Sequence, residues 1–208
     1  MLDPFAVIED VGAEPLRYYL MREVTLGQDG DVSLEGLRAR YNNELANELG
    51  NLVSRSVSMI GKYREGAIPQ AGPESESMAT VAAEGEAMVA RAAEQYEAIA
   101  VTAALDAIWE YVRRLNKLVE EEAPWKLAKD EALAGRLDAV LHGLAAGLRL
   151  VALAVYPVIP VTAVEILRRL GQAHGDADLL LEKAIWTALT PATVYVAPPL
   201  FPRLESTD

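Results

Sequence analysis

An apolar stripe with helical spacing runs through residues 34–63 and constrains the fold of this chain more than any other feature. Large apolar side chains recur there at three- and four-residue steps, at Leu34, Leu37, Tyr41, Leu45, Leu49 and Leu52. That period places them on one face of a long helix. A helix with one apolar face has to bury it against other elements, so the segment predicts one wall of a larger core.

Other segments repeat the helical pattern, and none shows a convincing strand alternation. Long helices are expected over about 78–98, over a segment ending at Glu122-Ala123-Pro124, over 130–155 and over 161–171. We therefore expect an all-α fold, a bundle of about five long helices with a short N-terminal segment and an extended C-terminal tail.

Local signals set several boundaries. Asp3-Pro4 predicts a helix start with Asp3 as N-cap, and a second helix is expected from Glu14-Pro15. Ser33 is a plausible N-cap for the long helix, without the Glu or Gln three residues on that would complete a capping box. Residues 27–31 predict a turn, and residues 64–77 predict an exposed loop.

Composition excludes several classes of function. The 208 residues carry a formal net charge of −12, which argues against non-specific binding of nucleic acid but leaves room for a small local RNA contact. Cysteine is absent, which excludes disulfides and thiolate catalysis and fits a cytoplasmic protein. We see no signal peptide and expect no membrane span, because the most apolar run, Leu150 to Val164, is interrupted by prolines.

The sequence contains no recognisable catalytic machinery. It has no Gly-rich phosphate loop, no His cluster with metal-ligand spacing and no nucleophile elbow. The two histidines lie far apart, and His142 in an apolar helix is better explained as a packing residue. We expect no catalytic residue and no metal site within this chain.

A polar stripe lies on the long helix, turned away from the leucines. Asn47, Asn51 and Arg55 follow one another at four-residue steps. Asn costs up to about 0.7 kcal/mol relative to Ala in a helix, and Gly50 about 1 kcal/mol, so the segment is not optimised for helicity. Amides donate and accept hydrogen bonds while a guanidinium only donates, a mixture that suits nucleobase edges. The alternative is an ordinary solvated face.

Pro124-Trp125 is the second informative feature. A Trp directly after a helix break, with Lys126 and Lys129 beside it, can stack on a nucleobase, an interaction worth about 1–3 kcal/mol. The alternative is that Trp125 fills the gap between two helices. A local basic strip would form if the following cations converge in the fold: Arg40, Arg55, Lys62, Arg64, Arg113, Arg114, Lys117, Lys126 and Lys129.

Four blocks of the chain resemble methionyl-tRNA synthetases, in the family's order. They are DPFAVIEDVGAEPLRYYLMREVTLGQDGDVS, RYNNELANELGNLVSR, LNKLVEEEAPWKLAK and PLFPRLE. The Pro-Trp pair and the final Leu-Phe-Pro-Arg favour methionine over the related class I synthetases for cysteine, valine, isoleucine or leucine. The family's mobile catalytic loop and its His-Ile-Gly-His-like motif have no counterpart in these residues.

The resemblance implies a domain organisation and a role. It implies a stem-contact-like segment at 1–32, an anticodon-binding helical bundle at 33–171, and a tail at 172–208 that packs back on the bundle or on a catalytic domain. The role is to read the CAU anticodon of methionine tRNA. By the match to the family's motifs, the residues that would do so are Asn47, Asn51, Arg55, Pro124, Trp125 and, less directly, Asn116.

By the same resemblance, the partners are the anticodon loop of methionine tRNA and the catalytic domain of the same chain, and neither DNA nor a membrane is expected. This part alone would not be catalytic and needs no cofactor. ATP, and zinc as a further option, would belong to the catalytic half. Two alternatives stay open: a helical protein-interaction module, and the corresponding bundle of another class I synthetase.

Overall fold

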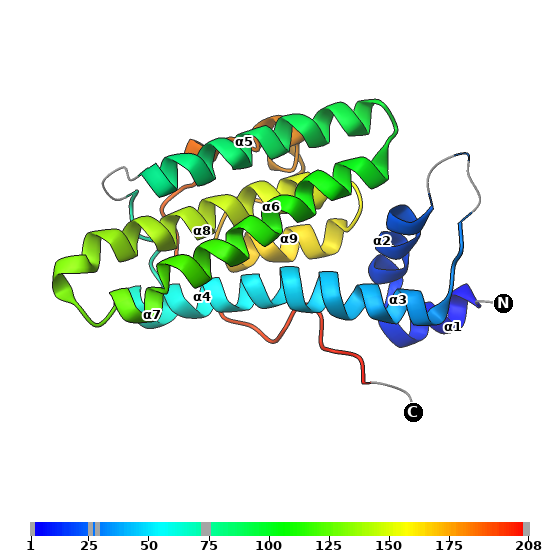
Figure 1. Ribbon diagram of the computed structural model, residues 1–208, viewed down its shortest axis with the longest axis horizontal. Coiled ribbons are helices and arrows are strands. Elements are labelled where there is room, and N and C mark those ends of the chain that lie inside the picture. Colours follow the sequence, from blue (N-terminus) through cyan, green and yellow to red (C-terminus); the bar gives the residue numbers. More distant parts are fainter. Residues whose placement is uncertain (1–2, 25–26, 28–29, 72–75, 206–208) are drawn as a thin grey trace.

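The structure is a computed structural model that describes residues 3–24, 27, 30–71 and 76–205. It is an all-α bundle, as predicted (Figure 1). The longer helices are α1 (Pro4–Val11), α2 (Ala13–Glu23), α3 (Leu34–Arg40), α4 (Asn51–Arg64), α5 (Glu76–Glu97), α6 (Val101–Glu122), α8 (Ala134–Val155) and α9 (Pro160–Arg169). Within the described ranges, the β-structure amounts to one isolated bridge, between Ala67 and Thr193.

The predicted long helix exists as one continuous rod of α3, a ten-residue π-helix η1 (Tyr41–Gly50) and α4. Ser33 is its N-cap, because its Oγ accepts a hydrogen bond from the Gly36 amide at 3.0 Å. The predicted apolar face is buried from Leu37 onward, whereas Leu34 at its first position is 45% exposed. Leu34 sits in the first turn, where α1 and its neighbours do not cover it.

The π-helical part of the rod ends at Gly50, next to the C-terminal tail. The Asn51 amide donates to the Ala46 carbonyl, five residues back, so the turn is wider than an α-turn. A Cβ on Gly50 would lie 3.0 Å from the Leu45 carbonyl oxygen and 3.7 Å from the Phe201 ring. Glycine therefore fits the place where the widened turn meets the C-terminal tail.

The helix α8 forms the centre of the bundle. In Figure 1 it lies between α5 on one side and the rod on the other, with α6 and α9 beside it. The segment Glu131–Val155 is long and apolar enough to cross a membrane by length and composition, but 83% of its apolar window is buried inside the fold. It is thus a core helix, as its position among the other helices requires.

The N-terminal helices α1 and α2 pack across one end of the rod. The predicted cap is present, with the Asp3 carboxylate accepting from the Phe5 amide at 3.0 Å. Helix α2 begins one residue earlier than expected, directly after Gly12, whose φ of 91° allows the sharp turn between the two helices. Of the predicted turn at 27–31, Gln28 and Asp29 lie outside the described residues.

A buried ionic network joins α2 to the rod and to α6. Glu44 accepts hydrogen bonds from Arg22, from Arg40 at 2.8 Å and from the Tyr18 hydroxyl, and Arg22 also reaches Asp106 at 2.6 Å. Burial alone would raise the pKa of Glu44. The hydrogen bonds from Arg22 and Tyr18, together with the Arg22 and Arg40 charges, outweigh burial and hold that pKa below its usual value. The network therefore links α2 to the rod and to α6 through hydrogen-bonded ion pairs.

The loop after α4 and the C-terminal tail run together over the bundle. The loop was expected to be exposed, but Ile68 is buried and its amide donates to the Ala192 carbonyl at 2.9 Å, so that prediction was wrong at this residue. The physical reason is that the tail covers it. Residues 72–75 of the same loop are outside the described part of the chain.

The C-terminal part of the tail packs against η1 of the rod. Phe201 is buried, with its ring edge-on to Tyr41 at 5.8 Å between centroids. Next to it, the Leu204 amide donates to Asn42 Oδ1 at 2.9 Å, and Asn42 Nδ2 donates back to the Leu204 carbonyl at 3.1 Å. The tail is thus held against η1 by an apolar anchor and a reciprocal pair of hydrogen bonds.

Candidate nucleic-acid interface

The residues predicted from the sequence lie where the rod meets α6 and the short helix α7 (Pro124–Leu127). We call this set the candidate face: Asn47, Asn51, Arg55, Asn116, Pro124 and Trp125. Its three rod residues lie along about 12 Å of helix axis or less, because each helical residue rises about 1.5 Å. That length exceeds the footprint of a single hydrogen-bonding group, so the candidate face is large enough for more than one contact.

Trp125 owes its position to a tight turn between α6 and α7. Ala123 takes a left-handed conformation with φ of 43°, and Pro124 occupies the first position of α7, where its missing amide hydrogen costs nothing. Pro124 is buried, whereas Trp125 is 38% exposed. The ring is therefore partly packed and partly available, which is neither of the two extremes expected from the sequence.

Arg55 and Trp125 share one surface. The Arg55 guanidinium carbon lies 6.0 Å from the centroid of the Trp125 ring, at the limit of a cation–π contact. Arg55 also forms an ion pair with Glu120 at 2.7 Å, with side-chain exposures of 31% and 63%. An exposed pair of this kind contributes about 0–1 kcal/mol, so an incoming group can replace it at small cost.

The side-chain amide of Asn116 is hydrogen-bonded to the protein backbone. Its Nδ2 donates to the Glu48 carbonyl at 3.0 Å and to the Val112 carbonyl at 3.1 Å. One donor of the amide therefore ties α6 to η1, the other bonds within α6, and Oδ1 keeps its acceptor capacity. Near this point burial raises the pKa of Glu48, against the opposing effect of the Arg113 charge.

Asn51 and Asn47 differ in their surroundings. Asn51 is exposed, whereas Asn47 is half-buried and accepts hydrogen bonds from Arg203 of the tail. The sequence analysis did not select Arg203, although it lies within the family-like block PLFPRLE. The order of the family-like blocks along the sequence did not reveal that PLFPRLE packs against RYNNELANELGNLVSR in the fold.

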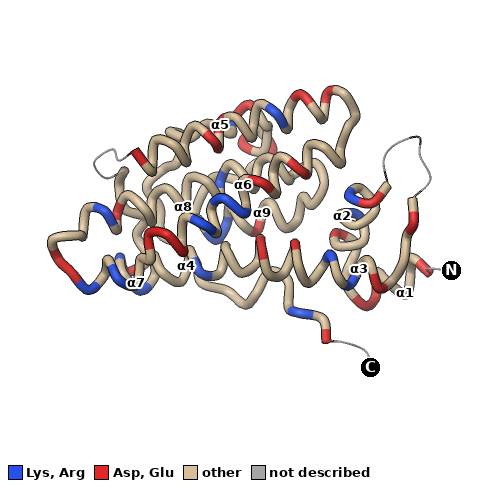
Figure 2. Tube along the Cα trace, in the orientation of Figure 1, with Lys and Arg blue, Asp and Glu red and all other residues tan. Residues whose placement is uncertain are grey.

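The expected basic strip does not form a continuous positive surface. Most of its cations are matched by carboxylates, as in the pairs Arg40–Glu23, Arg64–Asp138, Arg113–Glu48, Arg114–Glu84 and Lys117–Glu121. Figure 2 shows basic and acidic positions interleaved along α6 and the rod. Within the described residues, Lys126 and Lys129 beside Trp125 have no carboxylate within 4.0 Å. These two lysines, like Lys62, therefore form no ion pair with the described residues.

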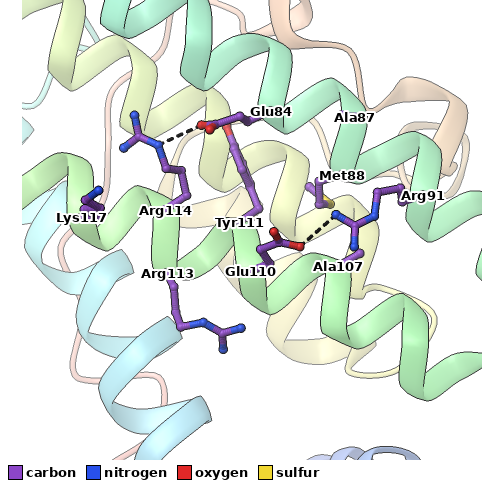
Figure 3. Close-up of a pocket in the computed structure, with 10 residues that line it drawn as sticks. All are labelled: Glu84, Ala87, Met88, Arg91, Ala107, Glu110, Tyr111, Arg113, Arg114 and Lys117. Carbon is purple, nitrogen blue, oxygen red and sulfur yellow. Dashed lines mark hydrogen bonds and ion pairs between the residues drawn. The ribbon is translucent and has the colours of Figure 1, made fainter.

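A hollow of about 430 Å³ lies between α5 and α6, away from α7 (Figure 3). Its cations are neutralised in the same way, Arg91 by Glu110 at 2.9 Å and Arg114 by Glu84 at 2.8 Å. The hollow therefore offers an anion little net positive charge. Across residues 3–24, 27, 30–71 and 76–205, no group of three or more His, Asp or Glu side chains is placed to hold a metal ion.

Comparison with known proteins places this arrangement in a family. A family model described as tRNA synthetases class I (M) matches residues 1–57. The methionine–tRNA ligase of Mycobacterium tuberculosis is 37% identical over 208 residues, covering 99% of this chain and 40% of that protein. The enzyme of Streptococcus pneumoniae is 41% identical over 203 residues, covering 97% and 30%.

Solved structures agree with the sequences. The free form of Mycobacterium tuberculosis methionyl-tRNA synthetase superposes with a TM-score of 0.88 at 35% identity, over 99% of this chain and 42% of that one. Its complex with methionyl-adenylate superposes with a TM-score of 0.90 at 36% identity, over 97% and 40%. This chain belongs to the methionyl-tRNA synthetase family.

The match extends over nearly all of this chain but over less than half of each relative. The chain spans about 30% to 42% of the length of these methionyl-tRNA synthetases, so it corresponds to a part of them. The relatives at this similarity are methionine–tRNA ligases, which agrees with the prediction of methionine rather than another class I specificity. The chain is accordingly related to a component of protein biosynthesis.

Proposed function

We propose that this chain recognises the CAU anticodon of methionine tRNA as part of a cytoplasmic methionyl-tRNA synthetase. The half-exposed ring of Trp125 beside Arg55 carries the proposal. A Trp with a free face stacks on any unstacked base, and the guanidinium next to it supplies hydrogen-bond donors at the edge of the same base.

The surroundings of the ring support an RNA ligand. Lys126 and Lys129 form no ion pair with a described carboxylate, so their ammonium groups are available to phosphates that adjoin a stacked base. Asn51 is exposed one helical turn from Arg55 and has an amide that both donates and accepts. A cognate base satisfies these groups, whereas a non-cognate base leaves one of them desolvated and unpaired, which costs about 1–3 kcal/mol.

The remaining roles follow from the family. The 1–32 segment would act as the stem-contact element, the 33–171 bundle would hold the anticodon, and the 172–208 tail would pack on the bundle or on the catalytic domain. That catalytic domain would bind ATP, and zinc where the enzyme uses it, and would join methionine to the tRNA. This chain by itself would bind RNA without catalysing that reaction.

Binding of short RNA hairpins tests the proposal. The chain is expected to bind a hairpin with a CAU loop more tightly than the same hairpin with a scrambled loop. Trp125→Ala should weaken CAU binding by about 1–3 kcal/mol, about 5- to 150-fold. Equal affinity for the two loops would refute anticodon recognition.

Tyr195→Ala is the matched control for this experiment. Tyr195 is also an exposed aromatic with an arginine over its ring, since the Arg168 guanidinium carbon lies 5.5 Å from its centroid. It lies on the tail beside α9, outside the candidate face. Its replacement should leave hairpin affinity unchanged, and an equal loss in both variants would mean that Trp125 has no special role.

A further inference from the structure

One tail residue contacts the candidate face directly. Arg203 Nε donates to Asn47 Oδ1 at 2.9 Å, and Arg203 Nη2 donates to the same oxygen. Arg203 lies between the two tail anchors, buried Phe201 and the hydrogen-bonded Leu204. The backbone on either side is therefore held, and the guanidinium is presented to Asn47 from a fixed position.

The chemistry of the pair fixes the orientation of the Asn47 amide. A guanidinium has no acceptor, so the amide atom that faces it has to be the oxygen. The two N–H groups on that one oxygen occupy its two lone pairs. What Asn47 can still offer to a ligand is the Nδ2 group, which is a donor.

Asn116 has the opposite polarity. Its two donors are used by the Glu48 and Val112 carbonyls, so that amide offers an acceptor. Asn47 and Asn116, two of the three Asn amides of the candidate face, are thus not interchangeable. Before any RNA binds, neighbouring residues already occupy the oxygen of the Asn47 amide and the nitrogen of the Asn116 amide.

Within the described part of the chain, no carboxylate cancels the charge of Arg203. Among the residues described, no carboxylate lies within 4.0 Å of its guanidinium, in contrast to Arg55, which is paired with Glu120. A salt bridge would compete with the Asn47 contact for the same N–H groups. Its absence leaves the guanidinium directed at Asn47.

We propose that Arg203 is a positioning residue for anticodon recognition, which locks Asn47 as a hydrogen-bond donor to an acceptor atom of the RNA. This inference rests on the proposed function. The locked amide favours a carbonyl oxygen or unprotonated ring nitrogen of a base and disfavours an amino group at the same place. Arg203 acts through Asn47 and does not itself contact the RNA.

A mutant cycle on hairpin binding tests this inference. Arg203→Met should weaken CAU hairpin binding about 3- to 10-fold, because Asn47 is then free to turn. The same change in an Asn47→Ala background should cause no further loss, since the residue it positions is gone. Additive losses in the double variant would overturn the inference.

The salt dependence of binding separates positioning from a direct phosphate contact. A residue that neutralises one phosphate of a single strand lowers the slope of log affinity against log salt by about 0.7 when it is removed. Arg203→Met is expected to leave the slope unchanged. A lower slope would show that Arg203 binds phosphate and would overturn the inference.

Arg38→Met provides the matched control. Arg38 also joins the rod to the tail, through the Glu205 carbonyl at 3.3 Å, but it does not touch Asn47. Its loss should not change hairpin affinity, and an equal effect would mean that tail docking in general is responsible. An amide resonance of Asn47 that does not shift on Arg203→Met in the free protein would also overturn the locking.

The same measurements separate the two proposals. If the unmodified chain does not prefer the CAU hairpin, anticodon recognition fails, and this inference fails with it. If the chain prefers CAU while Arg203→Met binds as tightly as the unmodified chain, only the role of Arg203 is refuted.

Discussion

Replacing Glu44 with Gln should destabilise the protein by about 2–3 kcal/mol. The Glu44 and Arg22 side chains are 14% and 8% exposed, so this is a largely buried pair. Removing one partner of a fully buried pair costs about 3–5 kcal/mol. The cost is smaller here because Asp106 still compensates Arg22 and because Gln still accepts hydrogen bonds.

Thermal and urea unfolding measure this effect. For a chain of this size, 2–3 kcal/mol corresponds to a fall in Tm of about 4–12 °C. Glu23→Gln is the matched control, since Glu23 pairs with Arg40 at an exposure of 32% and should cost no more than about 1 kcal/mol. Equal losses for both variants would refute the assignment of Glu44 as the centre of the network.

The pH dependence gives a second, independent check. The folded-state pKa of Glu44 is lower than its unfolded value, so its ionised form favours the folded state. That contribution is complete well above the unfolded pKa of about 4.3 and disappears as the pH falls through the lower folded pKa. The stability difference between the original chain and Glu44→Gln should therefore shrink below about pH 4, and a constant difference would contradict the reasoning.

Three further substitutions have distinct expected outcomes. Asn51→Ala should erode discrimination between CAU and other loops in hairpin binding while leaving stability unchanged or raised by up to about 0.7 kcal/mol, because Asn51 is exposed and Ala is the better helix former; lost stability with intact discrimination would contradict this. Phe201→Ala should cost the tail anchor about 3 kcal/mol and make residues 199–205 sensitive to limited proteolysis, whereas an equally resistant tail would show that Leu204 alone suffices. Gly85→Ala should lower unfolding stability by about 1–3 kcal/mol, because the new Cβ would lie 2.6 Å from the Tyr111 hydroxyl, and a stabilised variant would show that the ring moves aside.

Local signals predicted the helices well because they act over a few residues. Ser33 and Asp3 cap their helices through side-chain contacts two or three positions away, and the apolar period of the rod is visible in any short window. The exposure of Leu34 was not foreseen, because periodicity identifies an apolar face of a helix but does not say which elements cover its first turn.

The features that sequence reasoning missed depend on distant partners. The wide turn at Gly50 adjoins Phe201, and the orientation of Asn47 depends on Arg203, 156 positions away. Whether the cations form a basic strip was open for the same reason, because neutralising carboxylates such as Asp138 lie on other helices. Pairing across the fold cannot be obtained from the spacing of residues along one helix.

The contact between Arg203 and Asn47 also has a consequence for the timing of synthesis. Their separation of 156 positions corresponds to roughly 8–30 s of translation at 5–20 residues per second. During that interval the rod can fold against the helices already made, while the Asn47 amide is still free to rotate. If Arg203 fixes Asn47 as proposed, a nascent chain acquires its helical core first and its fixed donor last, and the selectivity that we propose for the bundle would arise only after the tail has left the ribosome.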